Sequence, residues 1–128
     1  MKCLSIMTII TLLLITQGCS NQAESLPEPE ATIQVQNDST LQFNRVEMKL
    51  YQEDHFVAGQ NGMYADGSII SNGDTLRFEY FEEDPIKFNA ETKIELTLYN
   101  DKQIVDQRNY NINFNQSKEI NLEVKDEG

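Results

Sequence analysis

Lys93-Ile94-Glu95-Leu96-Thr97-Leu98 is the stretch that decides the fold, because polar and apolar residues alternate strictly along it. Successive side chains of a β-strand point to opposite faces, so this period of two predicts a strand with one buried and one solvated face. Asn100-Asp101-Lys102 follows as a turn signal. The alternation returns in Ile120-Asn121-Leu122-Glu123-Val124, close to the end of the chain.

Similar alternation lies on both sides of this stretch, in residues 33–35, 46–50, 76–81 and 110–114. β-Branched and aromatic residues fill many of the apolar positions, and no stretch after Cys19 repeats apolar residues with helical spacing. We therefore predict an all-β fold, an immunoglobulin-like antiparallel β-sandwich of about seven strands. The alternative is a small, partly open β-barrel. "Immunoglobulin-like" describes the architecture alone, since the chain has no Trp and no pair of cysteines to bridge the sheets.

Two local features refine the prediction. The alternation shifts phase between Phe43 and Val46, which predicts a β-bulge near Asn44-Arg45. The last three strands are expected to form a meander, with Leu96, Ile112 and Leu122 in the core. An outward-facing run of asparagines, at positions 109, 111, 113 and 115, makes the strand around residues 110–114 unusually polar. Solubility explains such a run, and a polar binding face is the alternative.

The N-terminus carries a targeting signal. Lys2 is followed by an uncharged, mostly apolar stretch over residues 4–15, too short to span a bilayer as a helix. This stretch ends in Gly18-Cys19 and resembles the lipobox of bacterial lipoproteins. The resemblance implies cleavage before Cys19, a diacylglyceryl group on its thiol, and anchoring at the extracytoplasmic face of the cell membrane.

The resulting organisation has three parts. Residues 1–18 are the predicted signal peptide. Residues 19–31 are the lipidated cysteine and a flexible tether that is polar, acidic and contains Pro27 and Pro29. Residues 32–128 form a single β-sandwich domain. With Cys3 in the signal peptide and Cys19 lipidated, the domain has no disulfide.

The formal net charge of −11 argues against a nucleic-acid partner and against electrostatic docking on anionic lipid. No motif in the sequence points to a cofactor. His55 is the only histidine. It stands in Glu53-Asp54-His55, which could supply a base but is more typical of an exposed polar turn.

Acidic residues raise two chemical hypotheses. Glu82, Glu83 and Asp84 come directly before Pro85, which ends the preceding strand, and they could contribute to a calcium site at a loop. A solvated acidic edge is the alternative. Glu83 and Asp101 could also act as the acid and base of a small hydrolase.

Residues 59–74 form the predicted contact loop, because they contain three strong turn pairs, Asn61-Gly62, Asp66-Gly67 and Asn72-Gly73. Between these pairs lie the candidate partner-contact residues, Met63, Tyr64, Ile69 and Ile70. An exposed loop with apolar and aromatic side chains suits a protein contact. The alternative is a pair of compact hairpins in which Tyr64 and Ile70 cap the core.

The sequence favours a membrane-anchored, non-catalytic binding or accessory module. Its expected partner is an envelope protein, a wall polymer or a ligand. A structural subunit of an exported envelope complex is the first alternative, and the carboxylate-based hydrolase is the second.

Overall fold

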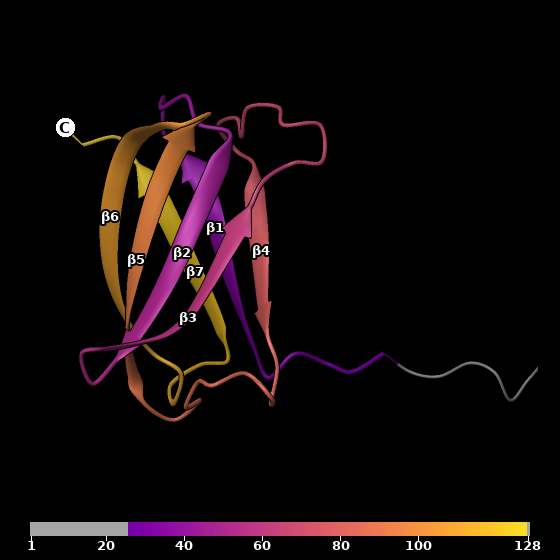
Figure 1. Cartoon of the computed structure of the whole chain (residues 1–128), viewed down its shortest axis with the longest axis vertical. Helices are drawn as coiled ribbons and strands as arrows, with labels where there is room; N and C mark the ends of the chain where they lie inside the picture. The colour runs from indigo at the N-terminus through magenta and orange to yellow at the C-terminus, as the bar shows by residue number, and fades with distance from the viewer. Residues whose placement is uncertain (1–25, 128) are drawn as a thin grey trace, which may run out of the picture.

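A computed structural model describes residues 26–127, which fold into seven strands arranged as two packed sheets (Figure 1). The seven strands are β1 (Ala31–Asp38), β2 (Arg45–Gln52), β3 (His55–Gly62), β4 (Thr75–Tyr80), β5 (Glu91–Asn100), β6 (Gln103–Asn113) and β7 (Glu119–Lys125). The predicted signal peptide, Cys19 and most of the predicted tether lie outside the described residues. Within residues 26–127 no helix is long and apolar enough to cross a bilayer.

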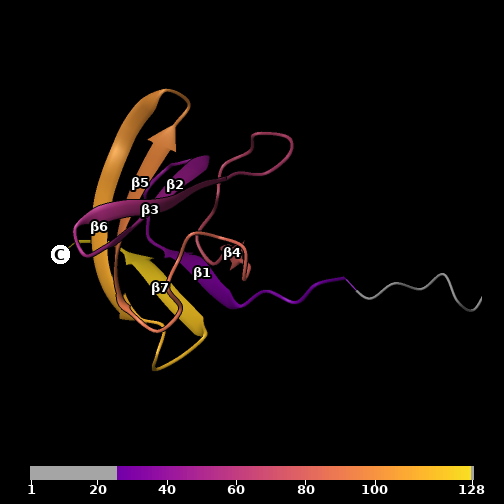
Figure 2. The same cartoon turned by 60° about the horizontal axis from the view of Figure 1, so that its bottom comes forward.

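The predicted all-β sandwich is confirmed. One sheet has the order β4-β1-β7 and the other β3-β2-β5-β6. Figure 2 shows them as two separate layers rather than one closed ring, so the barrel alternative is wrong. Five strand pairs join neighbours in these sheets, and four of them are antiparallel.

The predicted meander of the last three strands is wrong. β5 and β6 do form an antiparallel hairpin, but β7 crosses to the other sheet and pairs parallel with β1. Leu96 and Leu122 are buried as expected, whereas Ile112 is only partly buried. Alternation fixes which face of a strand is buried, but both sheets offer a buried face, so alternation alone does not select the partner strand.

The phase shift near Asn44-Arg45 is not a bulge. Residues 39–44 lie between strands and carry the chain from β1 in one sheet to β2 in the other. Strand alternation does not continue through an irregular segment, so β2 begins with a new phase. The register irregularities lie elsewhere, between Leu50 and Tyr51 and between Leu98 and Tyr99.

Strand β3 occupies residues in which the sequence predicts a turn. Asn61 and Gly62 pair with Glu47 and Val46 on β2 instead of turning the chain. A Cβ at Gly62 would lie 2.7 Å from a ring carbon of Phe78, so glycine here allows β3 to approach β4. The glycine of this Asn-Gly pair therefore serves close packing between the sheets, and it does not form a turn.

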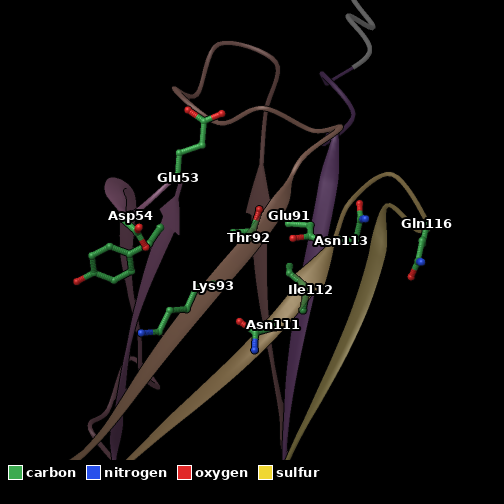
Figure 3. A pocket seen from close by; sticks show the side chains of 10 residues that line it. Glu53, Asp54, Glu91, Thr92, Lys93, Asn111, Ile112, Asn113 and Gln116 are labelled. Atoms are coloured by element: carbon green, nitrogen blue, oxygen red, sulfur yellow. The ribbon is translucent and has the colours of Figure 1, made fainter.

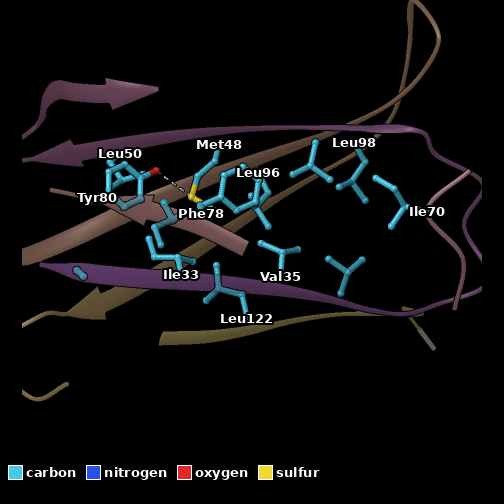
Figure 4. Packing of buried hydrophobic residues seen from close by; sticks show 14 of the residues in the cluster. Ile33, Val35, Met48, Leu50, Ile70, Phe78, Tyr80, Leu96, Leu98 and Leu122 are labelled. Atoms are coloured by element: carbon cyan, nitrogen blue, oxygen red, sulfur yellow. Dashed lines mark hydrogen bonds between the residues drawn. The ribbon is translucent and has the colours of Figure 1, made fainter. Parts of the chain in front are cut away.

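The core lies between the two sheets and contains the alternating apolar residues of both (Figure 4). Ile33 and Val35 face it from β1, and Leu96 and Leu98 from β5. Burying one such side chain contributes about 1.5–3 kcal/mol. Tyr80 is also buried, and its hydroxyl donates to Sδ of Met48 at 3.3 Å.

Edge strand β6 carries charged side chains on the side that faces the core. Arg108 pairs across the ladder with Leu96, and its guanidinium lies 2.8 Å from the carboxylate of Asp106. Tyr110 donates from its hydroxyl to the backbone oxygen of Glu123 in β7, which links the edges of the two sheets. Inward charges on an edge strand oppose pairing with another chain.

Candidate functional site

The loop between β3 and β4 does not present the candidate residues as one surface. Ile70 is buried at 1% exposure, and Tyr64 and Ile69 are partly covered. Only Met63 stays well exposed, at 53%. The alternative interpretation is therefore confirmed for Ile70 and Tyr64, which pack on the core. No strands form within residues 63–74, so the predicted hairpins are absent there.

Asn37 holds this loop against the sandwich. Its side chain is buried, donates to the backbone oxygen of Ile70 at 2.8 Å and accepts hydrogen bonds from Ser39. Backbone hydrogen bonds to Asp74 and Gly73 add two more links. Nothing in the local pattern singled out Asn37, because Asn before a turn is ordinary.

Two of the three predicted glycine turns are present. Gly67 and Gly73 have φ of 72° and 91°, the left-handed conformation that glycine adopts without strain. Asp74 closes the second turn by accepting hydrogen bonds from the backbone of Ser71 and the hydroxyl of Tyr64. The bond to Asp74 is the main reason that the pKa of Tyr64 is raised.

The acidic candidates do not converge. Glu82 and Glu83 are exposed, while the Asp84 carboxylate accepts a hydrogen bond from the backbone N–H of Phe81. In residues 26–127 no three His, Cys, Asp or Glu side chains are grouped to hold a metal ion. The structure therefore lends the calcium hypothesis no support.

The proposed hydrolase pair is separated. Asp101 lies in the β5–β6 hairpin beside Asn44, while Glu83 follows β4 at the other end of the sandwich (Figure 1). A carboxylate pair that hydrolyses a glycosidic bond needs a separation of roughly 5–10 Å. His55 is an exposed residue at the start of β3. Before it, Glu53 and Asp54 form the predicted polar turn, both with positive φ.

A groove of about 640 Å³ lies near the end of the sandwich where β5 begins and β6 ends (Figure 3). Three segments that are distant in sequence line it. The lining residues are Tyr51, Glu53 and Asp54, then Glu91, Thr92 and Lys93, and finally Asn111, Ile112, Asn113 and Gln116. In Figure 3, Glu53 and Asp54 lie on one side and Gln116 on the other, with Lys93 and Asn111 between them.

Strand register builds the middle of this groove. Tyr51 on β2 is opposite Lys93 on β5, and Lys93 is opposite Asn111 on β6. The residues beside them in sequence, Gln52 and Ile94, are buried, so this row of three faces away from the core. Neighbouring strands lie about 4.8 Å apart, which sets the three side chains at regular spacing.

The groove side chains are largely available to a ligand. Within residues 26–127, no carboxylate lies within 4.0 Å of the ammonium group of Lys93. The side-chain amides of Asn111 and Gln116 likewise have no hydrogen-bond partner in the part of the chain that the structure describes. Amides both donate and accept, so the groove presents unused donors and acceptors side by side.

At the other end of the same sheet face, the polar side chains form hydrogen bonds and ion pairs with one another. Arg45 donates to the side-chain oxygen of Asn61 at 2.9 Å and lies 3.9 Å from the ring centroid of Tyr99. Glu47 lies 3.4 Å from the ammonium group of Lys49. On this sheet face, the polar side chains at one end are paired with one another, whereas those at the groove end are free within the described residues.

A half-buried ring, Tyr51, lines the groove, and an exposed ring, Phe56, packs against it. The ring centroids of Tyr51 and Phe56 lie 5.9 Å apart at an interplanar angle of 71°. Phe56 is 59% exposed, and a Cβ at Gly59 would lie 3.3 Å from its ring. Gly59 therefore lets the Phe56 ring lie close to the β3 backbone, which fixes an exposed aromatic surface beside Tyr51.

Gln52 holds the segments beside the groove together, although it is not among the predicted site residues. It is buried and donates to the backbone oxygen of Lys87 and the hydroxyl of Thr92, while its own oxygen accepts from the backbone N–H of Lys87. These bonds join the end of β2 to the start of β5. A polar residue at the inward position of an alternating strand was the available signal.

Comparison with known proteins gives no indication of function. No protein-family model, no curated protein and no solved structure matches the chain. The functional conclusion therefore rests on the groove and on the residues that line it.

Proposed function

We propose that this protein is a non-catalytic binding module, held at the extracytoplasmic face of a bacterial membrane by a lipid on Cys19. Its ligand site is the groove between the β2–β3 turn and the end of β6. The observation that carries the proposal is the set of free polar groups on Lys93, Asn111 and Gln116. Polar side chains without internal partners can form hydrogen bonds with a ligand without first breaking a bond inside the protein.

Two alternatives have less support. A structural subunit needs a broad apolar contact surface. The large apolar side chains that are well exposed in residues 26–127, Leu26, Phe56, Met63 and Ile104, lie on four different segments. A hydrolase needs a paired acid and base, and the pair suggested by the sequence is divided between opposite ends of the sandwich.

The anchor is tested by expressing the full chain in a bacterium with labelled palmitate. Wild type should take up label and sediment with membranes, because two acyl chains give stable anchoring. Cys19→Ala should take up none. Equal labelling of both forms would refute the anchor.

The groove is tested with lipidated protein in detergent and with bacterial envelope fragments from which membranes have been removed. The double variant Lys93→Ala/Asn111→Ala should lose most of the bound fraction that wild type shows. The control, Lys102→Ala/Asn121→Ala, removes the same groups from exposed positions elsewhere and should bind normally. Equal binding by both double variants would place the site outside the groove.

A further inference from the structure

The chemistry of the groove is specific enough to select a ligand class. We infer that it binds a neutral, hydroxyl-rich glycan chain, an assignment that rests on the binding function proposed above. Three features of the groove favour this ligand: its mixture of charges, its free amides, and the aromatic rings beside it.

The charges argue against a charged polymer. Glu53, Asp54 and Glu91 line the groove together with one ammonium group, that of Lys93. The carboxylates, and a chain with a net charge of −11, repel a polyanion. The same carboxylates attract a polycation, but Lys93 opposes it in the middle of the row, where its ammonium group has no carboxylate within 4.0 Å in residues 26–127. A neutral polar ligand avoids both conflicts.

The hydrogen-bonding groups match hydroxyls. A sugar hydroxyl both donates and accepts, and so does the side-chain amide of Asn111 or Gln116. Carboxylates such as Glu91 accept from hydroxyls, and Lys93 donates to hydroxyl or ring oxygens. The row from Tyr51 to Asn111 crosses three strands, so these groups meet an extended ligand at successive points.

The rings supply the apolar part of the contact. A pyranose has a C–H face and a hydroxyl rim, so it can pack on an aromatic ring while its rim forms hydrogen bonds. Tyr51 lines the groove and is held edge to face against Phe56, which is 59% exposed. The rings therefore lie next to the free polar groups.

A peptide fits these features less well. Protein interfaces are centred on aromatic and apolar anchors and are depleted of Lys, Glu and Asp at their core, whereas such charged groups line this groove. Addition of a peptide strand to the adjacent edge of β6 is opposed by the inward-facing Asp106 and Arg108.

The experiment is affinity electrophoresis of the full-length lipidated protein in mild detergent. The gels contain soluble mannan, xylan, amylose or mixed-linkage β-glucan as neutral probes, alginate as the polyanion and oligolysine as the polycation. At least one neutral glycan should retard wild type. Asn111→Ala and Tyr51→Ala should each raise its dissociation constant by about tenfold, the effect of losing roughly one hydrogen bond or ring contact.

Asn121→Ala is the matched control, because Asn121 is exposed on the other sheet, and it should bind like wild type. Circular dichroism should confirm that Asn111→Ala and Tyr51→Ala are folded. Retardation by a neutral glycan that is lost in these two folded variants supports the inference.

Four outcomes overturn it. Retardation only by alginate or oligolysine gives the wrong ligand class, and retardation unaffected by Asn111→Ala and Tyr51→Ala gives the wrong site. If no probe binds while envelope fragments still bind through Lys93 and Asn111, the glycan inference fails and the proposed function stands. If the envelope fragments also fail to distinguish the groove variants, the proposed function fails with it.

Discussion

The loop of residues 63–74 and the groove at the opposite end of the sandwich differ in a way that the amino-acid sequence conceals. The loop is contiguous, rich in turn signals and carries apolar side chains, yet Tyr64 and Ile70 pack on the core. The groove is assembled from segments around residues 51, 91 and 111, none of which has a recognisable motif. Within the described residues, the groove side chains of Lys93, Asn111 and Gln116 lack internal partners.

The loop and the groove differ in whether their side chains already have packing or hydrogen-bond partners inside the protein. Ile70 in the loop loses contact with water by packing on the core, and Tyr64 is satisfied by Asp74. In the groove, Lys93 and Asn111 are exposed and directly opposite each other. A side chain whose contacts already stabilise the fold is a poor candidate for recognition, whereas an exposed polar group without an internal partner is a good one.

The largest expected effect tests whether the loop is part of the core. Ile70→Ala should lower the free energy of unfolding by about 2–5 kcal/mol, since it removes a fully buried side chain. Met63→Ala, in the same loop, should change it by less than about 0.5 kcal/mol. Urea denaturation measures both, and equal effects would show that the loop does not pack as described.

The next effect tests the polar link that holds the loop. Asn37→Ala should cost about 1–3 kcal/mol, because the backbone oxygen of Ile70 loses its buried donor. Asn72→Ala removes only a longer bond from an exposed side chain and should cost less. The two variants are compared by thermal and urea unfolding. A larger loss in Asn72→Ala would contradict the assigned role of Asn37.

A smaller effect appears at alkaline pH. The hydrogen bond to Asp74 raises the pKa of Tyr64, so the folded state keeps its proton longer than the unfolded state. This contribution is complete below the ordinary tyrosine pKa of about 10 and is lost as the pH rises through the raised folded value. Urea denaturation at about pH 8 and about pH 11 should show a smaller loss of stability in Tyr64→Phe than in wild type.

Tyr80 remains in both proteins of that comparison, so its effect cancels to first order. Burial is the main cause that raises the pKa of Tyr80, and the charge of Asp84 adds to it. An equal alkaline loss in wild type and Tyr64→Phe would show that the bond to Asp74 contributes nothing to stability at high pH.

The smallest effect on stability is expected in the groove. Lys93→Ala and Asn111→Ala remove exposed side chains and should each change the free energy of unfolding by less than about 0.5 kcal/mol. The same denaturation series measures this. A loss as large as that of Asn37→Ala would mean that these side chains maintain the fold, which removes the contrast between groove and loop.

Much of the fold could be predicted from the sequence. Alternation located β1, β2, β4, β5 and β7, and it identified Leu96 and Leu122 as core residues. It missed β3, because Asn61-Gly62 is a typical turn pair and Gly59 begins the predicted loop, while these glycines allow close packing against Phe78 and Phe56. A glycine needed for a positive φ and one needed for space look alike in a sequence.

The candidate site could not be predicted in the same way. The outward-facing asparagines of β6 did suggest a polar face, and Asn111 and Asn113 line the groove. Tyr51 and Lys93, however, become neighbours of Asn111 only through the register of three strands that are 42 and 18 residues apart in sequence at these positions. No local pattern encodes that register.

The sequence by itself determined that the described chain is all-β and which face of most strands is buried, because both follow from a period of two within single strands. Only the tertiary structure decided that β7 pairs with β1, that Ile70 belongs to the core and that a groove forms beside Lys93. The physical reason is that alternation is a local property, whereas strand partners and register are selected by the free energy of contacts between distant segments.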